Sequence, residues 1–299
     1  MAISGNATTS DGQPVDVVRI FRWPDKELYG AVLPDAAGDW TFEPVQSGEY
    51  GITYIAAGCQ PVTHGPYYLE VDNDPYYQNV VALLHFDGDF IDETGRIWYQ
   101  RGSQSIISET SAYFGGSGLR VDGIDSSLDS DAQLGMVGND RITIEGWMRI
   151  QSYTGPKMPG ANIYRHTLLG QSGNGSFRDQ FICIEEGFLK VERNNTYAGV
   201  NIAETSTTKV PLNEFFHIAY SYDGTTTRAF INGVKNIEFN SQNGWADTGY
   251  PLRIGANLNV GFQKYRQGSN ADFDDIRITK GISRYISDFD IPTKPFQNI

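Results

Sequence analysis

The chain has 299 residues, with 23 Lys and Arg against 36 Asp and Glu, and a formal net charge of -13. This charge argues against nucleic acid as the main partner, because nucleic-acid binding needs a basic patch. It equally disfavours an anionic membrane surface.

The composition favours an all-β fold. The chain holds 33 Gly, 17 Tyr and 16 Phe, and few of its apolar runs have the period of a helix. Its length allows one large β domain or two smaller ones. No long apolar run follows Met1, so we expect no signal peptide and no membrane insertion.

The two cysteines do not indicate a disulfide framework. Cys59 and Cys183 fall in different predicted domains, and each is flanked by apolar residues. We therefore expect two buried free thiols.

Residues 1–72 are predicted to form a small β-sandwich, because short apolar strands alternate with turn residues. Turns are expected at Asp11-Gly12, 35–39 and Ser47-Gly48. This segment resembles the carboxypeptidase-regulatory-like, or transthyretin-like, domain in Asp11-Gly12-Gln13-Pro14, in the spacing of Gly38, Trp40 and Phe42, and in 47–50. The resemblance implies a fold and no particular ligand.

A polar, proline-containing segment at 72–79 is the expected domain boundary. Beyond it, strands alternate cleanly. In 142–150, Ile142, Ile144, Gly146, Met148 and Ile150 share one face of the predicted strand, and Thr143, Glu145, Trp147 and Arg149 share the other. Asn232-Gly233, after an apolar run, predicts a tight hairpin.

Residues 77–299 resemble the laminin-G-like, concanavalin A-type sandwich of bacteriophage structural and tail proteins. The matching motifs are Leu-Leu-His-Phe-Asp-Gly at 83–88, Thr-Ile-Glu-Gly-Trp at 143–147, His-Ile-Ala at 217–219 with Asp-Gly at 223–224 and Phe-Ile-Asn-Gly at 230–233, and 274–285 at the end. The resemblance implies a jelly-roll sandwich whose first and last strands lie near each other.

Clustered carboxylates make calcium the sharpest metal hypothesis, because Ca²⁺ takes six to eight oxygen ligands. The predicted ligands come from the opening turn and the closing strand: Asp87, Asp89, Asp92, Asp274 and Asp275. If they converge, a cation or protonation must offset their repulsion. The alternative is that they are solvated turn carboxylates, or are paired with arginine.

A glycan site is the second hypothesis, because sugars bind flat aromatic faces beside planar polar groups. The candidates lie in polar, aromatic loops near the C-terminus: Trp245, Tyr250, Asn257, Asn259, Tyr265 and Arg266. Trp147 is expected to pack within its sheet because it lies in mid-strand, so Trp245 is the better aromatic platform.

Catalysis is not expected. Related folds host glycoside hydrolases that need paired carboxylates, but Glu145 stands alone on its strand, and the adjacent Glu185 and Glu186 face opposite ways. His85 and His217 lie within strands, where packing is the usual role.

These observations predict a non-enzymatic bacteriophage virion protein, such as a tail fibre, tail tip or capsid appendage, whose larger domain binds host surface polysaccharide. The alternative is a purely structural component that binds only other virion proteins. The protein would be made in the host cytoplasm and localise to the virion, and we expect a homo-oligomer by analogy with fibres.

Overall fold

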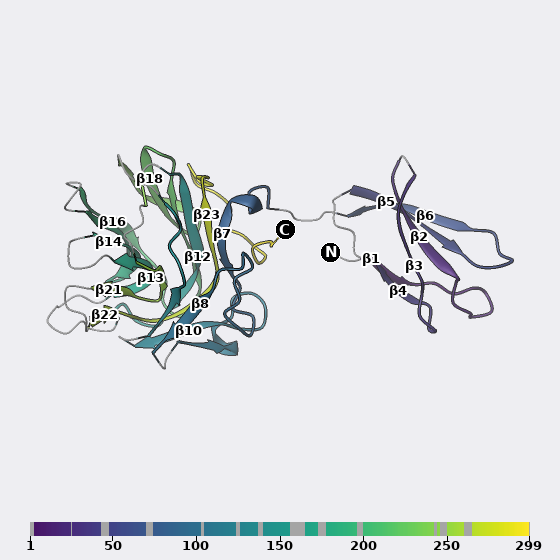
Figure 1. Cartoon of the computed structure of the whole chain (residues 1–299), viewed down its shortest axis with the longest axis horizontal. Helices are drawn as coiled ribbons and strands as arrows, with labels where there is room; N and C mark the ends of the chain where they lie inside the picture. Colours follow the sequence, from purple (N-terminus) through teal and green to yellow (C-terminus); the bar gives the residue numbers. More distant parts are fainter. Residues whose placement is uncertain are drawn as a thin grey trace. The chain divides into compact units, whose positions relative to one another are not determined.

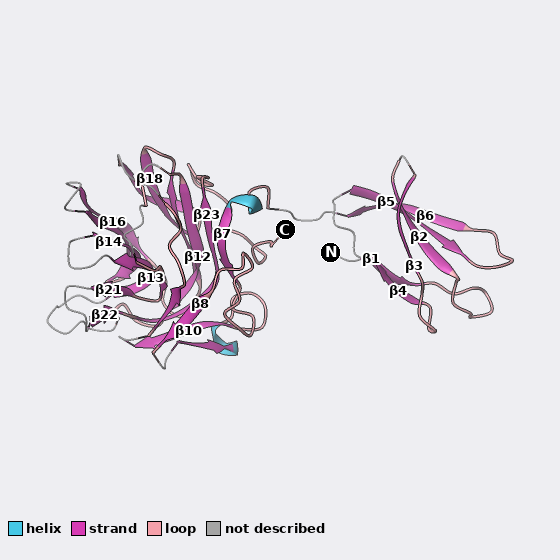
Figure 2. Cartoon of the chain, in the orientation of Figure 1, coloured by secondary structure: helices cyan, strands magenta, loops and turns pink. Residues whose placement is uncertain are grey.

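The computed structural model describes residues 3–24, 26–42, 48–69, 74–102, 105–123, 126–136, 140–155, 165–172, 178–195, 200–241, 244–245, 250–259 and 265–298. These residues form two compact units, Met1–Asn73 and Asp74–Ile299. Both consist of strands, and the helical segments are the short 3-10 turns η1 (Tyr77–Asn79) and η2 (Glu109–Ser111) (Figure 2). The all-β prediction is confirmed. No helix among the described residues is long and apolar enough to cross a membrane.

The first unit packs a two-stranded sheet, β1–β4, against a four-stranded sheet in the order β3-β2-β5-β6. Its strands are β1 (Ile3–Asn6), β2 (Val17–Arg22), β3 (Glu27–Val32), β4 (Asp39–Phe42), β5 (Gly48–Ile55) and β6 (Val62–Leu69). A small core of alternating inward residues includes Val18, Ile20, Trp40, Tyr50 and Ile52. Strand β6 ends the sheet and is exposed along its described length.

The second unit contains two large antiparallel sheets (Figure 1). The eight-stranded sheet comprises β19 (Val234–Asn240), β18 (Thr226–Ile231), β17 (Phe216–Tyr222), β12 (Ile142–Ile150), β23 (Ser269–Lys280), β10 (Gly118–Gly123), β9 (Ser105–Ser108), and β7 (Val80–Leu84), which pairs with β23. The seven-stranded sheet comprises β16 (Val200–Lys209), β15 (Phe188–Asn195), β14 (Arg178–Glu185), β13 (Arg165–Ser172), β20 (Arg253–Ile254), β11 (Ser127–Ser130) and β8 (Trp98–Arg101). The first and last strands of this unit are neighbours, as the resemblance implied, with Leu84 opposite Ile276.

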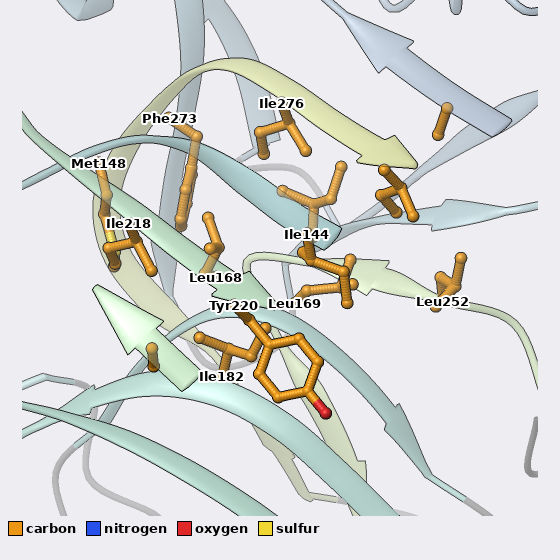
Figure 3. Close-up of a cluster of buried hydrophobic side chains, with 14 of the residues drawn as sticks. Ile144, Met148, Leu168, Leu169, Ile182, Ile218, Tyr220, Leu252, Phe273 and Ile276 are labelled. Carbon is orange, nitrogen blue, oxygen red and sulfur yellow. The ribbon is translucent and has the colours of Figure 1, made fainter. Parts of the chain in front are cut away.

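The core lies between these two sheets. Side chains from both converge there, among them Ile144 and Met148 from β12, Leu169 from β13 and Ile182 from β14 (Figure 3). Each fully buried aliphatic side chain contributes roughly 1.5–3 kcal/mol relative to exposure. The predicted inward face of residues 142–150 is confirmed.

A β-bulge in the closing strand explains the Glu-Gly-Trp sequence of β12. Trp147 pairs with Asp274, whereas Glu145 pairs with Arg277, so β23 carries one extra residue there. Asp275 takes a left-handed conformation with φ 49°. A Cβ on Gly146 would lie 2.9 Å from Ile276 Cγ1, so only glycine fits without a shift. The bulge keeps the successive residues Asp274 and Asp275 both out of the core.

Candidate functional site

The outer face of the eight-stranded sheet carries a buried ion network. Arg277 donates from Nη2 to Glu145 Oε1 at 2.8 Å and from Nη1 to Asp74 Oδ2 at 3.0 Å. Arg284 pairs with the same Asp74 carboxylate, and the Tyr285 hydroxyl donates to Glu145 Oε2 at 2.8 Å. Burial alone would raise the pKa of Glu145, but Arg277 outweighs it and lowers the pKa to about 2. Glu145 is therefore a structural anion.

The C-terminal tail, residues 281–298, closes this face. The Tyr285 and Phe289 rings stack with centroids 3.6 Å apart, and Phe230 packs against both. Phe296 lies under the Arg277 guanidinium at 3.8 Å, and its N–H donates to Asp275 Oδ2 at 2.7 Å. Because the tail covers Glu145 and Arg277, this part of the sheet is closed to a ligand.

Asp274 lies on the same face beneath the 113–117 segment. Its Oδ2 accepts the backbone N–H groups of Tyr113 at 2.6 Å and Phe114 at 2.8 Å. Tyr113 stacks on Trp147, with ring centroids 3.8 Å apart. Asp274 Oδ1 is buried without a hydrogen-bond partner among the described residues. Burial raises the pKa of Asp274 to about 7, with a further contribution from the neighbouring Asp275 charge.

The other predicted calcium ligands have protein partners. Asp87 Oδ1 accepts the Gly116 N–H at 2.8 Å, and Asp89 Oδ1 accepts the Ile91 N–H at 2.9 Å. Asp92 is buried and accepts four donors, from the Leu83 and Thr94 backbone, the Thr94 hydroxyl and Trp98 Nε1. Asp275 Oδ1 contacts His85 Nδ1 at 2.6 Å.

Asp87 and Asp274 thus bind the same loop, 113–117. The repulsion anticipated from the sequence is relieved at Asp274 by a raised pKa. Among the described residues, no group of three or more His, Cys, Asp or Glu side chains is placed to hold a metal ion. Asp92 is saturated by its four protein donors, whereas Asp274 Oδ1 has no hydrogen-bond partner among the described residues. The calcium site stays a prediction.

The outer face of the seven-stranded sheet carries a different charged cluster. Arg165 pairs with Glu185 and lies 3.2 Å from Glu192, while Lys190 approaches Glu185 at 2.8 Å and Glu192 at 3.4 Å. The Arg165 guanidinium lies 4.6 Å from the Phe181 ring centroid. The Glu185 and Glu192 side chains remain 23% and 22% exposed. Polar planar groups beside an aromatic ring therefore reach the surface here.

Four predicted glycan-site residues fall on one hairpin beside this sheet. Strands β21 (Asn257–Asn259) and β22 (Tyr265–Gln267) pair with Asn259 opposite Tyr265 and with Leu258 opposite Arg266. The hairpin lies next to β13 (Figure 1). The structure therefore brings Asn257, Asn259, Tyr265 and Arg266 together on a short two-stranded element.

Trp245 and Tyr250 are placed differently. Trp245 is fully buried, packs edge-on against Tyr220, and donates from Nε1 to Gln171 Oε1 at 3.2 Å. The backbone oxygen of Tyr250 accepts a hydrogen bond from Gln171 Nε2 at 2.8 Å. Trp245 thus presents no free face for stacking on a sugar. Its polar sequence neighbours gave a misleading indication, because a tryptophan in a polar loop can still fold back into a core.

Glu145 and Asp274 are not accessible to a substrate for glycoside hydrolysis. Glu145 and Asp274 have pKa values displaced in opposite directions, a pattern common in acid–base pairs. Both are fully buried beneath the tail and the 113–117 loop. Glu185 has a lowered pKa, because its contacts with Lys190 and Arg165 outweigh burial, so it is a poor proton donor.

A laminin-G family model, described as the concanavalin A-like lectin/glucanases superfamily, matches residues 122–282, more than half of the chain. The chain belongs to this superfamily. The match covers the strands from β11 to β23 and confirms the predicted jelly-roll sandwich. The superfamily includes both lectins and glucanases, so membership alone does not separate binding from catalysis. A comparison with curated proteins found no match.

Solved structures with a similar fold are distant. Domain 4 of AbnA, an arabinanase from Geobacillus stearothermophilus, was solved with arabinotriose; it is 14% identical over 69% of this chain and 94% of its own, with a TM-score of 0.47. The receptor binding domain of botulinum neurotoxin D is 9% identical over 75% and 51%, with a TM-score of 0.48. A Trypanosoma rangeli sialidase mutant is 12% identical over 68% and 31%, with a TM-score of 0.46. This chain spans about half of the neurotoxin chain and about a third of the sialidase chain. The family match remains the basis of the assignment.

Sequence reasoning missed two features. The first is the closed outer face of β12, although the strand period placed Glu145 and Trp147 there. The sequence signal for this closure was the positive charge of Arg277 and Arg284, because both need anionic partners once the tail covers them. The second is Cys59, which is exposed and corrects the prediction of a buried thiol, whereas Cys183 is buried as expected.

Proposed function

We propose that this chain is a non-enzymatic bacteriophage virion protein whose concanavalin A-like domain binds a host cell-surface glycan. One observation carries the proposal. Asn257, Asn259, Tyr265 and Arg266 lie together on the β21–β22 hairpin, beside a sheet whose outer face carries the Arg165 cluster. Amides, a guanidinium and a tyrosine are the residue types that hold sugar hydroxyls and stack on sugar rings.

Closure of the opposite sheet supports the same location. The C-terminal tail occupies the outer face of β12 and β23, and its aromatic rings fill the space that a ligand would need. The partly exposed carboxylates of the Arg165 cluster, by contrast, are oriented by Arg165 and Lys190. Carboxylate oxygens can accept hydrogen bonds from sugar hydroxyls.

The virion assignment is supported by the sequence motifs shared with phage laminin-G-like domains. Docking to other virion proteins and homo-oligomerisation belong to this proposal. Resemblance of the first unit to transthyretin-like domains stays a prediction and suggests a spacer or anchor.

Arg266→Ala is expected to weaken glycan binding about tenfold or more, because an arginine that hydrogen-bonds a ligand at a binding site is typically worth over 1 kcal/mol. The measurement is blocking of phage adsorption by the full-length protein, with direct binding to purified host polysaccharide. Arg141→Ala is the matched control, because Arg141 is exposed and precedes β12 in the other sheet. If the wild-type protein in its virion oligomer fails to block adsorption, the purely structural role replaces this proposal.

Calcium is tested separately by melting the protein in EDTA and then in excess Ca²⁺. A cation bound by Asp87, Asp274 and Asp275 would stabilise the folded state by mass action, so chelation would lower the Tm and Ca²⁺ would restore it. Mg²⁺ serves as the control ion, because it prefers a smaller octahedral site. An identical Tm in EDTA and Ca²⁺ contradicts the calcium site.

A further inference from the structure

A groove runs along the open side of the first unit, between strand β1 with its following loop and the β5–β6 hairpin. It consists of two hollows of about 510 and 440 Å³. The two hollows adjoin, because Tyr54 and Tyr67 line both of them. We call the two adjoining hollows the β1–β6 groove. Its size is within the range of small-ligand sites.

Aromatic rings form much of the β1–β6 groove. Trp40 is buried and lines one hollow, and Tyr54 meets it edge-on with ring centroids 6.1 Å apart. His64 packs edge-on against the other side of Tyr54 at 5.7 Å. Tyr67 and Tyr68 are 45% and 68% exposed. Tyr54 is thus held between two rings, while Tyr67 and Tyr68 offer apolar surface to solvent.

The polar lining of the groove is uncharged. It is made of hydroxyl and amide side chains, namely Ser4, Asn6, Thr8, Thr9, Ser10 and Gln60. Among the described residues, no Asp, Glu, Lys or Arg lines either hollow. The rest of the chain is rich in charge, with a net value of -13. An uncharged lining is complementary to an uncharged ligand and offers no ion pair to a phosphate, an acidic peptide or a basic peptide.

Trp40 is 4% exposed and lines the hollow of about 440 Å³. Gly5 lies directly against this ring, since a Cβ there would come within 3.3 Å of Trp40 Nε1. Glycine at this position therefore lets β1 pack closely on the indole.

A peptide that adds as a strand to the edge of β6 would explain these features less well. An added peptide strand needs a continuous row of free backbone groups on the edge strand. Pro66 lies in the middle of β6 and has no N–H, and the β5–β6 register shifts between Tyr50 and Ile52. Proline and irregular register are the devices by which edge strands avoid pairing. The side chains of the groove, not the edge of β6, are therefore the recognition surface.

We propose that the β1–β6 groove is a second carbohydrate-binding site, which takes a neutral oligosaccharide. Tyr67 and Tyr68 stack on the apolar faces of sugar rings. The hydroxyl and amide side chains bind ring hydroxyls. This site uses only residues of the first unit and does not depend on the proposed glycan site of the concanavalin A-like domain.

Cys59 provides a direct readout in the full-length protein. It is exposed and lines the groove, so a thiol reagent reaches it. Cys183 is buried, and burial raises its pKa to about 12, so it stays unreactive in the folded state. We would measure the alkylation rate of Cys59 with a fluorescent iodoacetamide. The neutral probes are maltohexaose, cellohexaose and mannohexaose, and the charged probe is a galacturonic acid hexamer.

At least one neutral hexasaccharide is expected to slow Cys59 alkylation several-fold in a saturable manner. Tyr67→Ala should raise the apparent Kd about tenfold, in line with loss of one stacking contact and its hydrogen bond. Leu33→Ala is the control, because Leu33 is 74% exposed in the same unit and lies outside the groove.

Three results would overturn the inference. They are an alkylation rate unchanged by all three neutral probes, protection by the charged hexamer alone, and full protection retained in folded Tyr67→Ala. Arg266→Ala separates the two sites, because it should leave Cys59 protection intact. Loss of adsorption blocking in Arg266→Ala with no Cys59 protection would support only the concanavalin A-like site. The reverse pattern would support only the groove.

Discussion

Glu145→Gln is expected to destabilise the larger unit by about 3 kcal/mol, the magnitude typical of a broken buried ion pair. The Glu145 carboxylate accepts hydrogen bonds from Arg277 and Tyr285 at 2.8 Å. A neutral amide would leave Arg277, itself buried, with only Asp74 as its anionic partner. For a unit of this size the loss corresponds to a fall in Tm of roughly 6–12 °C, measured by differential scanning calorimetry.

The Glu145 carboxylate also makes the free energy of unfolding depend on pH in the acidic range. Its pKa is about 2 in the folded protein against 4.5 as a free group, so its contribution is complete above pH 4.5 and is lost as the pH falls toward 2. The acid-side loss of stability should therefore be smaller in Glu145→Gln. Glu238→Gln is the matched control, since Glu238 pairs with Arg228 and Lys235 at the surface and should change the Tm little. Equal effects of the two substitutions would contradict the role of burial.

Asp274→Asn is expected to stabilise the protein above pH 7. The pKa of Asp274 is about 7 in the folded state against 3.8 as a free group. The folded state therefore keeps a proton that the unfolded state releases, and stability falls as the pH rises from 3.8 to 7. The shift corresponds to at most about 4 kcal/mol. An amide oxygen still accepts the Tyr113 and Phe114 N–H groups, but its NH₂ lacks a partner, so we expect a net gain of about 1–3 kcal/mol at pH 8.

The measurement is urea unfolding of wild type and Asp274→Asn at several values between pH 4 and pH 8. The wild-type stability should decline over this interval, whereas that of Asp274→Asn should decline less. Asp89→Asn is the control, because it makes the same replacement of a carboxylate by an amide at an exposed turn. A cation bound at Asp274 would reverse the sign, because the ionised form would then be favoured and the amide would destabilise the protein. The sign of the stability change in Asp274→Asn therefore also tests the calcium hypothesis.

Local patterns in the sequence predicted much of the larger sandwich. The alternation in 142–150 predicted its inward face, because a strand repeats every two residues whatever lies above it. Asn232-Gly233 predicted its tight turn, and both residues have positive φ, 49° and 76°. The laminin-G-like motifs predicted the jelly roll, since they contain the core and turn residues of that fold.

Only the tertiary structure decided which polar residues are accessible. Strand period placed Glu145 outside the core, but whether an outer face meets solvent or a returning tail depends on long-range packing. Trp245 turned inward for the same reason: a large apolar ring gains more by filling a core than its polar neighbours in sequence lose. The bulge at Asp275 likewise lies where β23 pairs with β12 on either side of Gly146, a contact between segments far apart in the chain.

In the β1–β6 groove too, the local sequence predicted the strands, and the tertiary structure decided which side chains meet. The sequence of the first unit contained its tyrosines, hydroxyls and Trp40, and their pattern predicted strands and turns. A groove forms only when β1 and β6, from opposite ends of this unit, leave the sandwich open between them. Strand formation depends on residues near in sequence, whereas the meeting of side chains from different strands depends on how the sheets pack, and that information is not local.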